Sequence, residues 1–207
     1  MNPILPISHS THETHETHVP HVPHGGIKNT LVYWLAAEIR RLNHIFITRY
    51  IPRNSRTFDQ MDQADRSGKQ NLVEGSLENS TESNLKLTGV SRASYGELNE
   101  DYQDFLFEHG FPQWDKNDPR VIRLRRILID PHAPHVTHDS HEWHEIRFDD
   151  PEAFANLMVT LCTKQGFLLD RFLQGIQDRF IREGGFRENL FKKRGEFRRS
   201  RNSPFAP

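Results

Sequence analysis

Apolar residues recur at helical spacing through most of this 207-residue chain, and no other feature of the sequence constrains the fold as strongly. In residues 29–50 the apolar positions are Leu31, Leu35, Ile39, Leu42 and Phe46. Spacings of three and four residues put these side chains on one face of an α-helix, whose period is about 3.6 residues. No segment alternates apolar and polar residues for more than a few positions. The pattern therefore predicts an all-α protein.

Start and stop signals divide the first half of the chain into three long helices. In chain order these signals are Pro52, Asn54 or Ser55, Gly75, residues 80–82 and Gly110. Proline cannot continue a helix, Asn and Ser are good N-terminal caps, and glycine weakens or ends a helix. We therefore expect one helix before Pro52, a second that starts at 54 or 55, and a third that ends near 110.

The second half of the chain predicts one short and one long helix. Asp118-Pro119 opens a short basic helix with the sequence VIRLRRIL. Residues 149–152 open the last long helix, because acidic residues and a proline suit the first helical turn, and Gly184-Gly185 ends it. Four long helices, with no strand pattern longer than a few residues, predict an antiparallel four-helix bundle. We expect a His-rich segment over 1–28, the bundle over 29–184 with a His-rich insertion at 131–148, and a flexible basic tail over 185–207.

Two segments of the chain resemble a known family of bacterial helical bundles. The run QMDQADRSGKQNLVEGS, followed by ELNEDYQDFL, matches the family pattern at Gln60, Gln63, Ala64, Arg66, Ser67, Gly68, Asn71, Leu72, Val73, Glu74 and Gly75. The segment FLLDRFLQGIQDRFIREGGFRENLFKKR is similar to an extension called the four-helix-bundle suffix. The family is that of proteins encoded in 23S ribosomal RNA intervening sequences, and its relatives include the accessory variability protein of diversity-generating retroelements. The resemblance covers residues 30 to 194 apart from the second His-rich tract.

This resemblance implies a function as well as a fold. Characterised members form a pentameric barrel of four-helix protomers with a basic surface. The retroelement member binds nucleic acid and a reverse transcriptase, and no enzymatic activity is associated with the family. The resemblance therefore implies a homo-oligomer, a pentamer in particular, that is not an enzyme. This chain departs from the family in its net charge of −1 and in its histidines.

Two tracts with a strict period of three contain eleven of the thirteen histidines. The first holds His9, His12, His15, His18, His21 and His24, and the second holds His132, His135, His138, His141 and His144. On an α-helix this period rotates successive residues by about 60°, and on a strand it alternates them between the two faces. Only polyproline II, with three residues per turn, aligns them in one stripe, and the embedded prolines favour that conformation.

The aligned imidazoles predict a transition-metal site. Successive histidines on polyproline II lie about 9.3 Å apart, so a single stripe cannot fill a tetrahedral zinc site. Two stripes, or stripes from neighbouring protomers, complete the ligand set for zinc, copper or nickel, and interleaved acids orient the imidazoles. Two alternatives stay open: repeat expansion in a disordered segment, and a pH-sensitive interaction surface.

Three groups of basic residues are candidates for nucleic-acid binding. They are Arg66 and Lys69 in the second helix, Arg123, Arg125 and Arg126 in the short helix, and Lys192, Lys193 and Arg194 in the tail. From 182 to 201 eight basic residues stand against three acids, and phenylalanines are interspersed. Segments of this composition contact RNA in some proteins and are merely solvated in others.

Nothing in the sequence predicts an enzyme. Asn71 and Glu74 lie one helical turn apart, a spacing that suits an acid–base pair, but we favour a polar bridge at a helix or protomer contact. The single cysteine, Cys162, excludes an intrachain disulfide and lies in an apolar stretch typical of a core. No nucleophile, base and orienting group occur at usable spacing.

The sequence also predicts a cytoplasmic protein without a membrane partner. Residues 1–10 lack a basic region before a long apolar run, and no stretch of about 18 apolar residues exists. The function that the sequence predicts is a non-enzymatic homo-oligomeric scaffold that binds transition metal through its histidine tracts. The alternative is a nucleic-acid-binding accessory protein.

Overall fold

A computed structural model describes residues 26–127 and 142–201, and most of these residues are helical. The helices are η1 (Ile27–Asn29), α1 (Leu31–Tyr50), α2 (Arg56–Leu77), α3 (Thr81–Glu108), α4 (Pro119–Arg126), α5 (Pro151–Glu183) and α6 (Phe186–Arg201). The strands of the described residues are β1 (Glu142–Trp143) and β2 (Ile146–Arg147), which pair antiparallel. The prediction of an all-α fold is confirmed for this part of the chain.

Side-chain caps define the starts of the five helices α1 to α5. The capping residues are Thr30, Ser55, Ser80, Asp118 and Asp150, each of which accepts a hydrogen bond from a backbone N–H in the first turn. Each such cap stabilises a helix by about 1 kcal/mol. The starts predicted near 55, 81, 119 and 151 are therefore confirmed. Gly75 does not end α2, which continues to Leu77.

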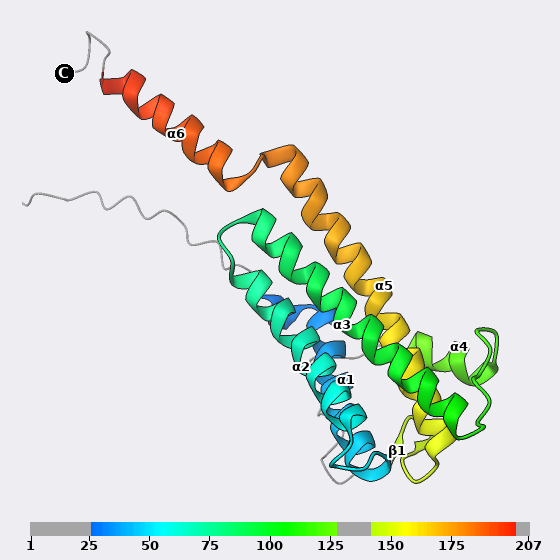
Figure 1. The fold of residues 1–207 in the computed structure, drawn as a ribbon. Coiled ribbons are helices and arrows are strands. Elements are labelled where there is room, and N and C mark those ends of the chain that lie inside the picture. The colour runs from blue at the N-terminus through cyan, green and yellow to red at the C-terminus, as the bar shows by residue number, and fades with distance from the viewer. Residues whose placement is uncertain (1–25, 128–141, 202–207) are drawn as a thin grey trace, which may run out of the picture.

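The four long helices α1, α2, α3 and α5 pack around one apolar core (Figure 1). α2 packs against α1 and α3, and α5 packs against the same two helices. The face predicted for the first helix is the buried one, with Leu35, Ile39 and Leu42 fully inaccessible to solvent. Phe46 occupies the centre of an aromatic cluster, because its ring centroid lies 4.9 Å from that of Tyr102 and 5.3 Å from that of Phe154.

Residues 142–148 correct the prediction of an extended His-rich insertion. They form a tight hairpin whose Trp143, Ile146 and Phe148 side chains are buried in the core. His144 and Glu145 make the turn, with φ of 47° and 72°. Both values lie in the left-handed region, as a two-residue hairpin turn requires. The prediction of polyproline II is therefore wrong at His144, and residues 128–141 lie outside the described part.

The C-terminal segment corrects the prediction of a flexible tail. Residues 186–201 form α6, and none of its residues is buried. In Figure 1 this helix continues beyond the end of α5 and points away from the packed helices. Across residues 26–127 and 142–201, no helix is long and apolar enough to cross a membrane.

Candidate nucleic-acid interface

The α6 helix carries the largest net positive charge of the helices that the structure describes. Its basic residues are Arg187, Lys192, Lys193, Arg194, Arg198, Arg199 and Arg201, and its acids are Glu188 and Glu196. The net charge of these sixteen residues is +5, and all of the basic side chains are exposed. Because the whole chain has a net charge of −1, this charge is a local property of α6.

Apolar side chains interrupt the positive charge of α6 at helical spacing. Phe186, Leu190 and Phe197 lie within about 40° of one another on the helix, and all three are exposed. Phe191 projects elsewhere and is 81% exposed. The guanidinium of Arg201 lies 5.9 Å from the ring centroid of Phe197. Cationic groups that contact phosphates, next to rings that stack on bases, are the elements of a single-strand binding surface.

Two glycines set the position of α6 relative to α5. Gly184 has φ of 75°, a left-handed conformation that glycine adopts without strain and that ends α5. Gly185 is buried, and the Glu82 side chain at the start of α3 lies directly against it. The backbone N–H of Gly185 donates to the Glu188 carboxylate at 3.1 Å, and the Asn189 amide donates to the Glu183 carbonyl at 3.0 Å. These contacts fix the first turn of α6 next to α3.

The structure does not bring the three predicted basic groups together. Lys192, Lys193 and Arg194 are exposed on α6, whereas Arg123, Arg125 and Arg126 are exposed on α4. α4 packs against α5 at the end of the molecule opposite α6 (Figure 1). On α2, Arg66 is exposed and the Lys69 ammonium lies 5.7 Å from the ring centroid of Tyr33. The α4 group lies with Arg120 on a helix that contains no acid, whereas the α6 group lies among further basic residues and exposed phenylalanines.

Of the predicted metal ligands, the structure describes only His144. Its exposed ring contacts the Trp143 ring edge-on, with centroids 4.3 Å apart. His9, His12, His15, His18, His21, His24, His132, His135, His138 and His141 lie outside the described residues. Within residues 26–127 and 142–201, no group of three or more His, Cys, Asp or Glu side chains is arranged to hold a metal ion.

Asn71 and Glu74 do not form an acid–base pair. The Asn71 amide donates to the Ser67 carbonyl at 2.9 Å and to the Ser67 hydroxyl at 3.1 Å, both within α2. Glu74 is exposed and accepts from Gln70 at 2.8 Å. Both contacts lie within α2, and a bridge from these residues to a second protomer stays a prediction.

A buried polar network in the core was not predicted from the sequence. Asn43 donates to the Met61 carbonyl and to Asp65, each at 3.2 Å, and accepts from the Tyr102 hydroxyl at 2.6 Å. Arg40 donates to the same Asp65 oxygen at 3.3 Å. Burial raises the pKa of Asp65 to about 7, although Arg40 opposes the change. The only signal in the sequence is an Asn beside Leu42 on an apolar helix face.

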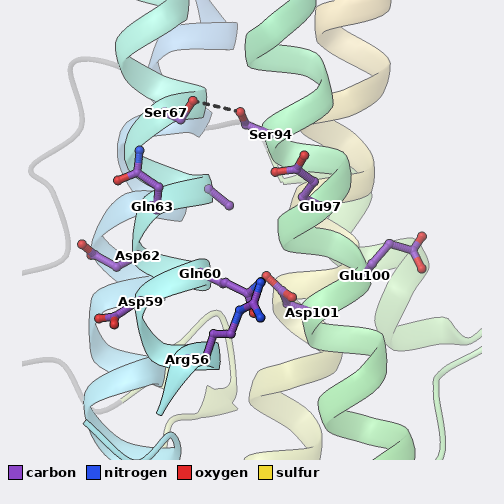
Figure 2. Close-up of a pocket in the computed structure, with 11 residues that line it drawn as sticks. Arg56, Asp59, Gln60, Asp62, Gln63, Ser67, Ser94, Glu97, Glu100 and Asp101 are labelled. Atoms are coloured by element: carbon purple, nitrogen blue, oxygen red, sulfur yellow. Dashed lines mark hydrogen bonds between the residues drawn. The ribbon is translucent and has the colours of Figure 1, made fainter. Parts of the chain in front are cut away.

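An acidic groove between α2 and α3 was also not predicted. It has a volume of about 800 Å³, and its carboxylates are Asp59, Asp62, Glu97, Glu100 and Asp101 (Figure 2). Arg56 is the basic residue of its lining. Burial, together with the neighbouring Asp104 and Glu97 carboxylates, raises the pKa of Asp101 to about 6. The acids at 97, 100, 101 and 104 follow helical spacing, so this face was visible in the sequence.

The chain matches no protein-family model, no curated protein and no solved structure.

Proposed function

We propose that the protein is a non-enzymatic, homo-oligomeric four-helix-bundle scaffold that binds single-stranded nucleic acid through α6. The observation that carries this proposal is the α6 helix, with its charge of +5 and its exposed phenylalanines. Phosphate contacts supply most of the affinity for a single strand, and aromatic side chains add stacking on any base. The resemblance to bundles that bind nucleic acid supports the same function and supports a pentamer.

The helical packing supports the scaffold part of the proposal. α1, α2, α3 and α5 form a single closed core, and the buried acid Asp65 is engaged by structural partners. The acidic groove between α2 and α3 has a negative charge that does not suit a polyanion. α6 is therefore the surface that we assign to nucleic acid.

Replacing Lys192, Lys193 and Arg194 by alanine is expected to weaken binding to single-stranded RNA and to reduce its salt dependence. Each lost phosphate contact lowers the slope of log K against log salt by about 0.7, so the slope falls by about 2. Fluorescence anisotropy with an RNA of about 20 nucleotides, titrated over a range of salt concentrations, measures both quantities. Alanine at Arg53, Lys86 and Lys116, which are exposed on other elements, is the matched control. Equal losses in both triple variants contradict the assignment to α6.

Transition-metal binding through the histidine tracts is the second candidate function. The specific observation in its favour is the strict period of three at two separate places in the sequence. Stoichiometric uptake of zinc, copper or nickel is expected, and it falls as the pH drops through the imidazole pKa of about 6.5. Native mass spectrometry with and without a chelator measures metal content and subunit number together. A protein that takes up no metal, or that takes it up equally well with glutamine at all eleven tract positions, contradicts this function.

A further inference from the structure

The α6 helix lacks a packing partner within the described part of its own chain. None of its sixteen residues is buried, and it contacts the remainder only near its first turn. Isolated helices of this length are marginally stable in water, so most protein helices depend on packing of an apolar face. Phe186, Leu190 and Phe197 form such a face on α6. A surface that packs against α6 is therefore expected, and the seven basic residues of the helix favour an acidic one.

The acidic groove is the surface of this protein that complements α6. Its lining holds five carboxylates and one guanidinium, and one of the five, Asp62, is already paired with Arg40 of α1 at 2.7 Å. α6 has seven basic residues and two acids. In Figure 2 the Arg56 side chain reaches toward Gln60 and Asp101 between the two helices, and Glu97 projects from α3 above them. Burial is the main reason that the pKa of Asp101 is raised to about 6, and the nearby Asp104 and Glu97 carboxylates add to it. A cationic helix relieves the repulsion among these carboxylates.

The position of α6 favours the groove of a second copy over its own groove. Gly185 lies against Glu82, whereas the groove begins at Ser94, about 18 Å further along α3. From Gly185, α6 points away from the packed helices, so its basic residues leave its own groove behind (Figure 1). Contacts of Gly185, Glu188 and Asn189 hold this direction.

We propose that α6 of one copy docks in the acidic groove between α2 and α3 of a second copy. The basic residues of α6 then face carboxylates of the groove, and the Ser67–Ser94 hydrogen bond marks the upper end of the contact. The same basic residues are those that we assign to phosphates. Nucleic acid and the groove therefore compete for α6, and binding of nucleic acid releases this contact between copies. The docking itself does not depend on nucleic acid, so the two proposals can fail separately.

Cross-linking between two variants, each with one introduced cysteine, tests the docking. The native Cys162 is buried and is the only cysteine in the sequence, so it does not react. Copies with Gln63→Cys in the groove are mixed with copies that carry Ser200→Cys in α6, and a short bismaleimide is added without nucleic acid. We expect covalent dimers with one copy of each variant, identified by intact mass. Gln177→Cys, at an exposed position on α5, replaces Gln63→Cys as the matched control and is expected to cross-link at background level.

Charge reversal makes the test specific for the groove. Glu97→Lys and Glu100→Lys, added to the groove-cysteine copy, are expected to lower the cross-link yield about tenfold. Arg198→Glu and Arg199→Glu in the copy with Ser200→Cys are expected to restore the cross-link yield. The new glutamates on α6 then attract the new lysines in the groove. Glu78→Lys and Glu108→Lys, at exposed positions outside the groove lining, serve as the charge control. All of these positions are exposed, so circular dichroism is expected to show an unchanged helical fold.

Three results overturn this proposal. The first is a cross-link yield for Gln63→Cys no higher than that for Gln177→Cys. The second is a cross-link yield that stays the same when Glu97 and Glu100 are replaced by lysine. A yield that is lowered by those replacements but is not restored by Arg198→Glu and Arg199→Glu has the same meaning. The third is cross-linking only within a single chain that carries both cysteines, which shows that α6 folds back on its own groove.

Discussion

Replacing Asn43 by leucine is expected to destabilise the protein by about 3 to 5 kcal/mol, although leucine is apolar and of similar size. Asn43 is fully buried, and its amide satisfies three polar groups on two neighbouring helices, α2 and α3. Leucine leaves the Tyr102 hydroxyl and the Met61 carbonyl without that partner, and it removes one of the two donors to Asp65. Each buried polar group that loses its partner costs about 1 to 3 kcal/mol. Urea unfolding followed by circular dichroism measures the change.

Asn71→Leu is the matched control for this substitution. Asn71 lies on the neighbouring helix, is partly exposed, and makes hydrogen bonds only to Ser67. Water can replace those bonds, so its loss is expected to cost less than about 1 kcal/mol. If the two variants have the same free energy of unfolding, the network around Asn43 does not stabilise the core.

Helical structure could be predicted from the sequence because local signals determine it. The starts of α2, α4 and α5 follow from Ser55, Asp118 and Asp150, whose side chains cap the N–H groups of residues two or three positions later. The burial of the α1 face follows in the same way from its apolar spacing. Interactions of this kind span less than one helical turn, so the residue types alone reveal them.

The polar core and the groove depend instead on which helices become neighbours. Asn43 meets Tyr102 only because α1 packs across the core from α3, and these two residues are 59 positions apart. The Asp59 and Glu97 carboxylates share a groove only because α2 and α3 lie side by side. The acidic spacing on α3 was visible in the sequence, but nothing in it indicated which helix would form the second wall.

The predictions of an extended segment at the hairpin and of a flexible tail at α6 were wrong for a different reason. Composition suggested extended or flexible chain at both places, because histidine, charge and glycine dominate there. Trp143 and Phe148 instead anchor the hairpin in the core. In α6 the spacing of Phe186, Leu190 and Phe197 is helical, but the high charge obscured that pattern. Apolar side chains at regular spacing were the better guide in both segments.

The stability of the protein is expected to fall as the pH rises from about 4 to about 7, because of Asp65. Burial raises the pKa of Asp65 from 3.8 to about 7 in the folded protein. Between these two values the folded chain holds a proton that the unfolded chain has released, so each step up in pH favours unfolding. The stabilisation is complete below about pH 4, is lost through about pH 7, and amounts to about 2 to 4 kcal/mol.

The geometry of the carboxyl group explains why Asp65 can hold this proton. One oxygen accepts from Arg40 and Asn43, while among the described residues the other oxygen has no hydrogen-bond partner and is buried. Protonation of that second oxygen removes a buried charge and breaks no existing hydrogen bond. The other titratable groups that act on Asp65 or are acted on by it are Arg40, Asp62, Tyr95, Tyr102 and Cys162. Burial raises the pKa of both tyrosines and of the cysteine, so these three groups stay neutral throughout the window.

Asp65→Asn isolates this contribution, because asparagine keeps the shape of the side chain and cannot titrate. The free energy of unfolding in urea at about pH 5 and about pH 8 is expected to differ less in this variant than in the wild type. In Asp65→Asn the free energy of unfolding is still expected to fall with rising pH, but by less, because the pKa of Asp101 is also raised, to about 6. Asp101→Asn provides the comparison, and it is expected to change the slope less than Asp65→Asn because Asp101 is only partly buried. A wild-type stability that rises with pH over this range, or an equal slope in Asp65→Asn, is inconsistent with a protonated Asp65 in the core.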